Sequence, residues 1–379
     1  MICFIFKKIK FLLVLFFDLI LNLYGRLFVK DKSGVICFDC LYDENQEPID
    51  TYIFFKYLKK QNIKVKYFVL NVFRDKFENE DGIIFVKNKW QFIFKYLKEI
   101  AKSKYIITSF GLFDSIDMKL AKYKGSEYIF LEHGVRYLYK SLDNIYSSEN
   151  FNKILVPSKF TFDLYKNNNA WNEESMILSG LPRWDEYNLE EYSKNKSVFV
   201  FFTWRKTFLS NPKTAKEYVK AITLFLDKLS SKFPLNVDIY FAWHHEILKN
   251  NIPLPELNFR INLVKTNEIS NYIKSTSLLI TDYSSVCWDY FYQNKPVIFY
   301  RFDSNSSYFD ESDIANVIEL KNIDKVFQNC FYKETVVIEK ALYYCNMGFV
   351  LESFENTFYK TLFWDTSCNC EKILASLSI

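Results

Sequence analysis

Short apolar runs alternate with longer amphipathic stretches along most of the chain. In the first half, the runs that predict buried strands cover residues 35–38, 65–70, 83–86, 105–108, 128–131, 154–156 and 176–178. Stretches at 48–60 and 89–101 repeat apolar residues at helical spacing, and Pro48 suits the first turn of a helix. This alternation of strands and helices is typical of a parallel sheet with helices on both faces.

The same rhythm restarts after residues 190–196, a polar segment without periodicity, so we place a domain boundary there. Predicted strands follow at 198–202, 237–243, 259–263, 278–281 and 297–300, with helices at 213–229 and 268–275. The expected fold class is α/β, with two doubly wound Rossmann-like domains, 30–190 and 191–352, facing each other across a cleft. Ligands of such folds bind at the carboxyl ends of the strands. Residues 353–379 are expected to form terminal helices that can cross back to the first domain.

Residues 1–29 have a basic start and an apolar body, but no small residues follow that would suit signal-peptide cleavage. Asp18, Asn22 and Arg26 recur every four residues, so they share one face of a helix. We expect an amphipathic helix that lies in the membrane interface and holds the protein peripherally at the cytoplasmic face of the membrane. The alternatives are a helix docked on the protein's own core and a membrane-spanning helix, which would bury Asp18.

Composition narrows the possible partners. Hydrophobic residues make up 49% and charged residues 25% of the 379, as in an ordinary globular protein. The net charge of +4 comes without a dense basic run, so no nucleic-acid partner is expected. Two cysteine pairs have zinc-ligand spacing, Cys37 with Cys40 and Cys368 with Cys370. Because Cys37 falls in a predicted buried strand, we expect reduced thiols, and neither a metal nor a cofactor.

The three histidines of the chain, His133, His244 and His245, all fall at or just after the end of a predicted strand. Gly134 follows His133, and a glycine there allows a ligand or backbone to approach closely. A neutral imidazole can take a proton from an attacking hydroxyl. The alternative for each position is a histidine that is hydrogen-bonded within a turn.

Other polar groups also follow predicted strands. Ser284 and Ser285 precede an amphipathic stretch, where their hydroxyls can cap a helix or help to bind phosphate. Arg205 ends another strand and can pair with phosphate oxygens. Arg183 with Asp185 can form a structural ion pair or belong to the cleft. The chain has no P-loop, GxGxxG, GxSxG or HExxH motif, which argues against NTPase, dehydrogenase, hydrolase and metalloprotease functions.

Taken in order, these motifs resemble one family. The quoted segments are 132–134 (EHG), 180–185 (GLPRWD), 203–205 (TWR), His244, 281–289 (TDYSSVCWD) and 295–300 (KPVIFY). They are similar to the CDP-glycerol glycerophosphotransferases, which prime and polymerise teichoic acids and related capsule polymers. The resemblance implies a GT-B-like fold with the acceptor side in 30–190 and the donor side in 191–352. It also implies transfer of a polyol phosphate from CDP-glycerol or another CDP-polyol to a lipid-linked or polymer acceptor, with release of CMP.

The resemblance also assigns roles to residues. His133 matches the histidine that is a candidate general base, and His244 matches one that stabilises charge on the transferring phosphate. Ser284 and Ser285 match the pair that holds the donor diphosphate, with Arg205 as a further phosphate ligand.

Asp289 matches an aspartate near the nucleotide ribose, and Thr281 and Arg183 are expected to line the donor site or cleft. Glu132 stands where the family often has Trp, and His245 stands where it has Pro. Both departures lie beside the expected reacting groups, so they leave the acceptor and the polyol open.

Two other functions remain open from the sequence. One is a GT-B glycosyltransferase that uses a nucleotide sugar for cell-surface polysaccharide synthesis, because the fold alone does not separate the two chemistries. The other is a non-catalytic, membrane-associated binding or assembly subunit, which would have no need of both histidines.

Overall fold

The structure is a computed structural model. It describes residues 23, 32–39, 41, 49–77, 80–110, 125–136, 150–168, 170–187, 196–209, 211–250, 252–306, 309, 320–364 and 368–377. The membrane-interface helix expected at 1–29 lies outside these residues, apart from Leu23. No helix among the described residues is long and apolar enough to span a membrane.

The chain divides into two compact units. The first comprises Met1–Val135, Leu142–Asp185 and Trp364–Ile379, and the second comprises Arg136–Ser141 and Glu186–Phe363. The division after residue 185 lies 5 residues before the boundary predicted after 190, and the division after residue 363 lies 11 residues beyond the one predicted after 352.

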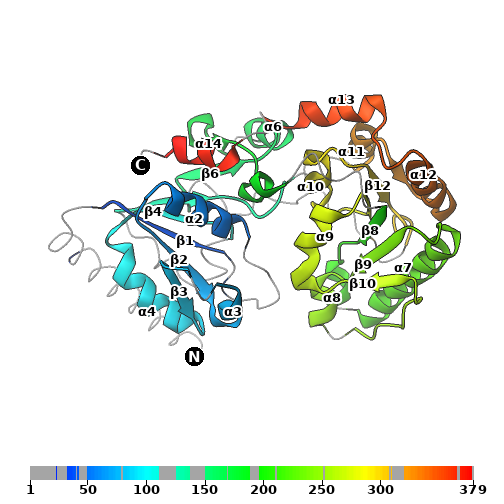
Figure 1. The fold of residues 1–379 in the computed structure, drawn as a ribbon, viewed down its shortest axis with the longest axis horizontal. Helices are drawn as coiled ribbons and strands as arrows, with labels where there is room; N and C mark the ends of the chain where they lie inside the picture. The colour runs from blue at the N-terminus through cyan, green and yellow to red at the C-terminus, as the bar shows by residue number, and fades with distance from the viewer. Residues whose placement is uncertain are drawn as a thin grey trace, which may run out of the picture. The chain divides into compact units, whose positions relative to one another are not determined.

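The first unit contains a seven-stranded parallel sheet with the order β3-β2-β1-β4-β5-β6-β7 (Figure 1). Its strands are β1 Gly34–Phe38, β2 Val65–Leu70, β3 Ile83–Val86, β4 Ser103–Thr108, β5 Glu127–Phe130, β6 Lys153–Val156 and β7 Met176–Leu178. The chain progresses to one side of β1 through β2 and β3, and then to the other side from β4 onward. The carboxyl ends of β1 and β4 therefore flank the point where the strand order reverses, which is where such sheets bind ligands.

Helices cover the first sheet. They are α2 Asp50–Lys60, α3 Arg74–Phe77, α4 Lys89–Ile100, α6 Lys159–Asn167 and α14 Asn369–Ala375. Asn88 caps the start of α4 by accepting from the Gln91 N–H, and Ser158 does the same for α6. The C-terminal helix α14 packs against α2 and β7.

The second unit contains a six-stranded parallel sheet with the order β10-β9-β8-β11-β12-β13. Its strands are β8 Ser197–Phe201, β9 Asp238–Ala242, β10 Ile261–Leu263, β11 Leu278–Thr281, β12 Val297–Tyr300 and β13 Cys330–Phe331. Here the order reverses between β8 and β11. The prediction of parallel α/β sheets is confirmed, and β13 was missed because a two-residue strand carries too little periodicity.

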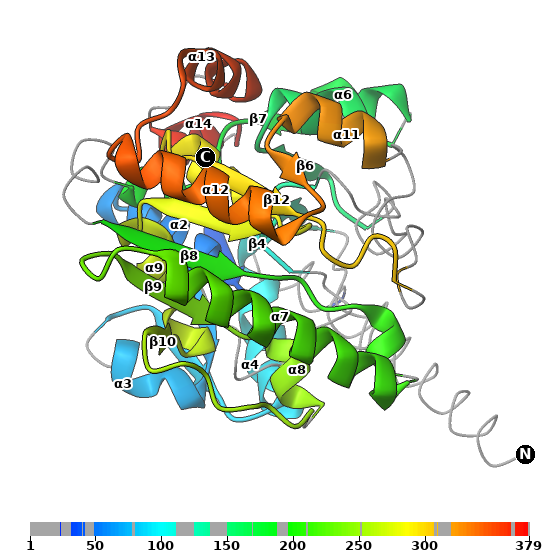
Figure 2. The ribbon, with the colours of Figure 1, turned by 90° about the vertical axis from the view of Figure 1, so that its right-hand side faces the viewer.

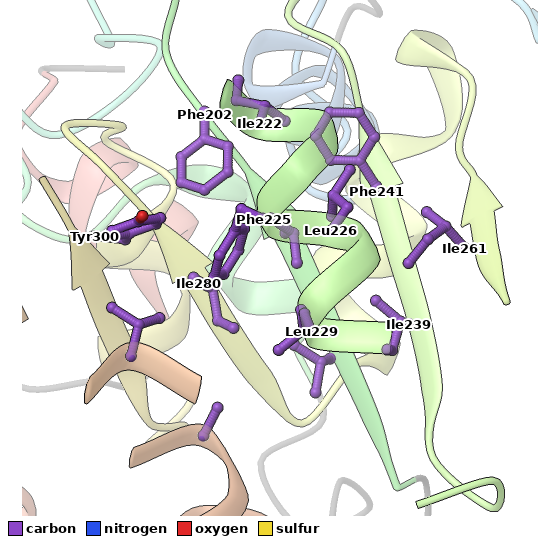
Figure 3. Close-up of a cluster of buried hydrophobic side chains, with 14 of the residues drawn as sticks. Phe202, Ile222, Phe225, Leu226, Leu229, Ile239, Phe241, Ile261, Ile280 and Tyr300 are labelled. Atoms are coloured by element: carbon purple, nitrogen blue, oxygen red, sulfur yellow. The ribbon is translucent and has the colours of Figure 1, made fainter. Parts of the chain in front are cut away.

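Seven helices are described in the second unit: α7 Pro212–Lys232, α8 His245–Lys249, α9 Ile269–Ser275, α10 Cys287–Tyr292, α11 Leu320–Phe327, α12 Glu334–Asn346 and α13 Ser353–Leu362. Figure 2 shows α7 and α12 side by side on one face of the sheet, whereas α9 and α10 lie on the other (Figure 1). Apolar side chains of α7, such as Phe225 and Leu229, pack on Ile239 and Ile280 of the strands (Figure 3). This packing holds the strand ends in place.

Of the two cysteine pairs, the structure describes Cys37, Cys368 and Cys370. Cys37 is buried in β1, and Cys40 lies outside the described residues. Cys368 is exposed and Cys370 is buried at the start of α14. Among the described residues, no group of three or more His, Cys, Asp or Glu side chains is placed to hold a metal ion.

Candidate active site

His133 lies just beyond the carboxyl end of β5, with an exposed side chain. Its Nδ1 is 3.1 Å from the carbonyl oxygen of Ser109, which follows β4. Because a carbonyl only accepts, Nδ1 carries the hydrogen and the lone pair of the neutral ring is at Nε2. The ring also stacks on Phe110, with centroids 4.9 Å apart and planes 12° apart. His133 is thus fixed as a tautomer whose Nε2 can accept a proton.

The backbone around His133 is held as well. Glu132 adopts a left-handed conformation with φ of 55°, which costs a residue with a side chain about 1–3 kcal/mol. Its buried carboxylate accepts a 2.7 Å hydrogen bond from the Tyr165 hydroxyl. Nη1 of Arg183 donates to the His133 carbonyl over 3.3 Å. A strained backbone that several surrounding contacts hold in place is common at functional sites.

Arg183 pairs with Asp50 at the start of α2, and its backbone N–H donates to the same carboxylate over 3.1 Å. The pairing considered between Arg183 and Asp185 stays a prediction. Asp185 accepts hydrogen bonds of 2.7 Å from the backbone N–H groups of Asn369 and Cys370, which open α14. A helix N-terminus offers free N–H groups, and the Asp185 carboxylate satisfies two of them.

His244 lies at the carboxyl end of β9 and precedes α8. Its Nδ1 accepts a 3.3 Å hydrogen bond from the Glu246 backbone N–H, so the neutral ring carries its hydrogen on Nε2. Burial, followed by the nearby charges of His245 and Arg205, lowers the pKa of His244 to about 3. The side chain is therefore a neutral hydrogen-bond donor at physiological pH.

Arg205 is almost completely buried at the end of β8. Its guanidinium contacts Asp282 at 2.8 Å and Asp303 at 2.9 Å, and Nη1 donates to the Thr203 carbonyl over 2.6 Å. Burial raises the pKa of Asp303, and the charge of Arg205 opposes that rise. The guanidinium, expected to bind phosphate, is thus occupied by two carboxylates from the ends of neighbouring strands.

The predicted serine pair lies between β11 and α10. Ser284 is buried, and its Oγ accepts a 3.3 Å hydrogen bond from the Val286 N–H. Ser285 is partly exposed, and its carbonyl accepts from the Trp288 N–H over 3.1 Å. The two serines therefore form the turn that leads into α10.

Two other predicted donor residues are buried and have protein partners. The Thr281 hydroxyl donates to the Phe201 carbonyl across the sheet. The Asp289 carboxylate accepts a 2.7 Å hydrogen bond from the Tyr187 hydroxyl. These contacts tie Thr281 to β8 and Asp289 to Tyr187 within the second unit.

The structure thus groups His133 with Arg183 in the first unit. It groups His244 with Arg205 in the second unit, where Thr281, Ser284, Ser285 and Asp289 also lie. Sequence reasoning missed Asp39 and Ser109, although each is a polar residue directly after a predicted strand. Their place directly after a predicted strand could have marked both residues as candidates.

Two parallel α/β sheets with polar side chains at their carboxyl ends place this chain in the class of doubly wound proteins, which as a class bind ligands at strand ends. The family model of CDP-glycerol:poly(glycerophosphate) glycerophosphotransferase matches residues 24–316, which include every site residue above. The chain belongs to this family.

Individual relatives agree with that membership. A teichoic acid poly(glycerol phosphate) polymerase of Bacillus spizizenii is 24% identical over 367 residues, covering 86% of this chain and 89% of the relative. The minor teichoic acid biosynthesis protein GgaB of Bacillus subtilis is 25% identical over 224 residues, covering 53% of this chain. The match spans only 25% of GgaB's own length.

A solved structure of the wall teichoic acid polymerase TagF has the same fold. It superposes with a TM-score of 0.57 over 98% of this chain and 95% of TagF. The sequence identity is 16%, so this likeness concerns the fold.

Proposed function

We propose that this protein transfers glycerol phosphate, or a similar polyol phosphate, from a CDP-linked donor to a hydroxyl of a polymer or lipid-linked acceptor. CMP is the second product. The observation that carries the proposal is that the two imidazoles make opposite hydrogen bonds at Nδ1, which give the neutral rings opposite tautomers. His133 has its lone pair on Nε2, whereas His244 has its hydrogen there. Family membership supplies the reaction class in which these two histidines would act.

His133 is the general base of the proposed reaction. Its Nε2 removes the proton of the acceptor hydroxyl while the hydroxyl oxygen forms a bond to the donor's β-phosphorus. The bond from that phosphorus to the bridging oxygen breaks, and CMP leaves with that oxygen. Positioning and electrostatic stabilisation contribute most of the rate in reactions of this kind.

His244 is the charge-stabilising donor. Its Nε2–H donates to an oxygen of the transferring phosphate, where negative charge builds up. A neutral donor suits this role because it does not require a proton from solvent. Its fixed tautomer also means that no reorganisation is needed during the reaction.

The donor diphosphate is assigned to the turn at Ser284 and Ser285. Arg205, with its two carboxylate partners, holds the ends of β8, β11 and β12 around that turn. Thr281 and Asp289 position the nucleotide site through buried hydrogen bonds, and Arg183 positions His133. The GT-B-like cleft stays a prediction.

Membrane attachment is also part of the proposal. An acceptor carried by a lipid or a cell-surface polymer would be met at the cytoplasmic face of the membrane, where residues 1–29 are expected to bind peripherally. The basic residues of this segment favour anionic head groups.

The test is CMP release by the purified protein with CDP-glycerol or, separately, CDP-ribitol, in the presence of a membrane or glycolipid extract. His133→Ala and His244→Ala are each expected to lower turnover about 10²–10³-fold. His245→Ala is the matched control because it alters the neighbouring, half-buried imidazole, and it should keep most of the activity.

Other outcomes separate the rival functions. Release of a nucleoside diphosphate from a nucleotide sugar, without CMP from either CDP-polyol, would favour the glycosyltransferase. Folded protein with no turnover of any donor would favour a binding or assembly subunit. Wild-type turnover in a histidine variant would remove that residue from the mechanism.

A further inference from the structure

Asp39 directly follows β1 and is almost completely buried. Its carboxylate accepts hydrogen bonds from the Thr51 N–H over 3.2 Å and the Thr51 hydroxyl over 2.6 Å. The Tyr67 hydroxyl donates to it over 2.8 Å, and the Ser109 hydroxyl donates to the same carboxylate. All these donors are neutral. Burial raises the pKa of the Asp39 carboxyl, and the hydrogen bonds from Ser109, Thr51 and Tyr67 oppose that rise because they stabilise the carboxylate.

The sheet order brings this charge towards His133. Phe38 of β1 lies opposite Thr108 of β4, and Thr108 lies opposite Phe130 of β5. Asp39 and Ser109 are therefore the first residues beyond two adjacent strands, at the reversal point of the sheet. His133 follows the third strand of this row.

Ser109 links the other two residues. Its hydroxyl donates to Asp39, and its carbonyl accepts from Nδ1 of His133. The neighbouring Thr108 hydroxyl donates to the Phe110 carbonyl over 2.9 Å and accepts from the Phe110 N–H over 3.1 Å. This short turn is therefore held on both sides of Ser109.

We propose that Asp39 is a positioning residue for His133 and acts through Ser109. This inference rests on the proposed function, in which His133 is the base. The carboxylate fixes the turn that selects the Nδ1–H tautomer. Its charge also favours the imidazolium that forms when the acceptor O–H bond breaks and an N–H bond forms at Nε2.

A purely structural role makes a different prediction. Asp39 also ties the start of α2, through Thr51, to β2, through Tyr67. If Asp39 served only to hold these elements together, removing one of its hydrogen-bond donors would lower stability and leave the titration of His133 unchanged.

The test variants described below leave the other charged groups near His133 unchanged. Glu132 stays bound to Tyr165, and Arg183 stays paired with Asp50. On the Asp39 side, Cys37 and Tyr67 are the titratable neighbours, and burial raises the pKa of both. None of these groups is changed in the two test variants.

The direct experiment follows the ring nitrogens and Cε1–H of His133 by NMR across pH in the full-length protein. The chain has three histidines, so their signals can be assigned with single substitutions. Asp39→Asn keeps the shape and removes the charge. Its His133 titration midpoint should move to lower pH by roughly half a unit, because an attractive charge is lost. Ser109→Ala should give the same direction of shift and a mixture of tautomers.

Tyr67→Phe is the matched control, since it removes one hydrogen bond from the same carboxylate without touching Ser109. Its midpoint should stay at the wild-type value. An unchanged midpoint and tautomer in both folded test variants would overturn the proposal. An equal shift in Tyr67→Phe would also overturn it, because the effect would then be general. Ser109→Ala keeps the test decisive if Asp39→Asn does not fold.

Activity provides a second readout. The acidic limb of the pH profile of kcat/KM should move to lower pH in Asp39→Asn, and its plateau should fall about 10–100-fold, as when a partner of a reacting group is removed. If His133→Ala retained full activity, the proposed function would lose its base. The NMR result would still decide whether Asp39 governs the tautomer of His133.

Discussion

Arg205 and Asp282 form an ion pair of 2.8 Å in which both side chains are almost completely buried. The pair joins the segment after β8 to the segment after β11, on the two sides of the strand-order reversal. Asp282 also accepts from the Thr203 N–H over 2.8 Å, which ties the same two segments again. The turn at Ser284 and Ser285, to which we assign the donor phosphates, therefore follows a segment that is anchored by a buried charge cluster.

Removing the charge of Arg205 should destabilise the protein strongly. Arg205→Met leaves Asp282 and Asp303 buried without their cation, so unfolding should become easier by about 3–5 kcal/mol. Denaturant titration measures this change. Lys166→Met, which breaks an exposed pair with Glu173, is the control and should change stability by about 0–1 kcal/mol. Equal effects of the two substitutions would contradict the structural role given to Arg205.

His244 should make stability depend on pH. Its pKa is lowered from 6.5 to about 3 in the folded protein, so the unfolded chain binds more protons between these values. Stability is therefore fully present above pH 6.5 and is lost progressively as the pH falls towards 3. His244→Gln should flatten this part of the curve.

Denaturant midpoints measured every half unit from pH 4 to 8 test the His244 prediction. The comparison variant is His245→Gln, which alters the adjacent ring. Parallel curves for the wild type and His244→Gln would show that burial does not hold this imidazole neutral.

Lys295 should stabilise the end of α9. Its Nζ donates to the carbonyls of Ile273 over 3.1 Å and Lys274 over 2.7 Å. Lys295→Met removes a donor from both carbonyls, although the Ile273 carbonyl keeps a 3.3 Å hydrogen bond from Nε2 of Gln293, and should cost about 1–3 kcal/mol. Lys274→Met is the neighbouring control and should cost about 0–1 kcal/mol, because its pair with Glu186 is partly exposed.

Lys295 should also make the stability of the protein depend on pH. Burial lowers the pKa of Lys295 to about 6, so the unfolded chain binds more protons between this value and the ordinary 10.5. The stability of the wild type relative to Lys295→Met should therefore rise as the pH increases above 6. A difference that shrinks with rising pH would refute this assignment.

Gly180 should tolerate no side chain. A Cβ at this position would lie 2.5 Å from Oδ1 of Asn369 and 2.7 Å from Cε3 of Trp184. Gly180→Ala should therefore displace α14 from its packing against the first unit, and it should destabilise that unit by about 1–3 kcal/mol. Thermal unfolding, together with the rate of proteolysis within residues 364–379, measures the effect.

A double variant tests the cause of the Gly180 effect. Asn369→Ala removes one clashing group, so Gly180→Ala should cost less in that background than in the wild type. Fully additive effects would mean that the contact with Asn369 does not limit the size of residue 180.

The sequence by itself determined where the strands lie and which histidines stand at their ends. Apolar runs mark β2, β3, β7, β11 and β12 with the boundaries that the structure has. Hydrophobic periodicity is a local property, so it can be seen without knowing which strands pair. It also placed His133 and His244 at carboxyl ends, where ligands bind in parallel sheets.

Only the tertiary structure decided which partners these residues have. Asp50 is 133 positions from Arg183, Ser109 is 70 from Asp39, and Asp303 is 98 from Arg205. These pairs form because the order of strands in each sheet brings distant chain segments to one edge, and local spacing contains no record of that order.

The tautomers of the two histidines show this division most clearly. The sequence indicates two imidazoles at strand ends and does not distinguish their chemistry. The Ser109 carbonyl makes His133 an acceptor at Nε2, and the Glu246 N–H makes His244 a donor there. A ring nitrogen takes its role from the group that faces the other nitrogen, and the fold supplies that group.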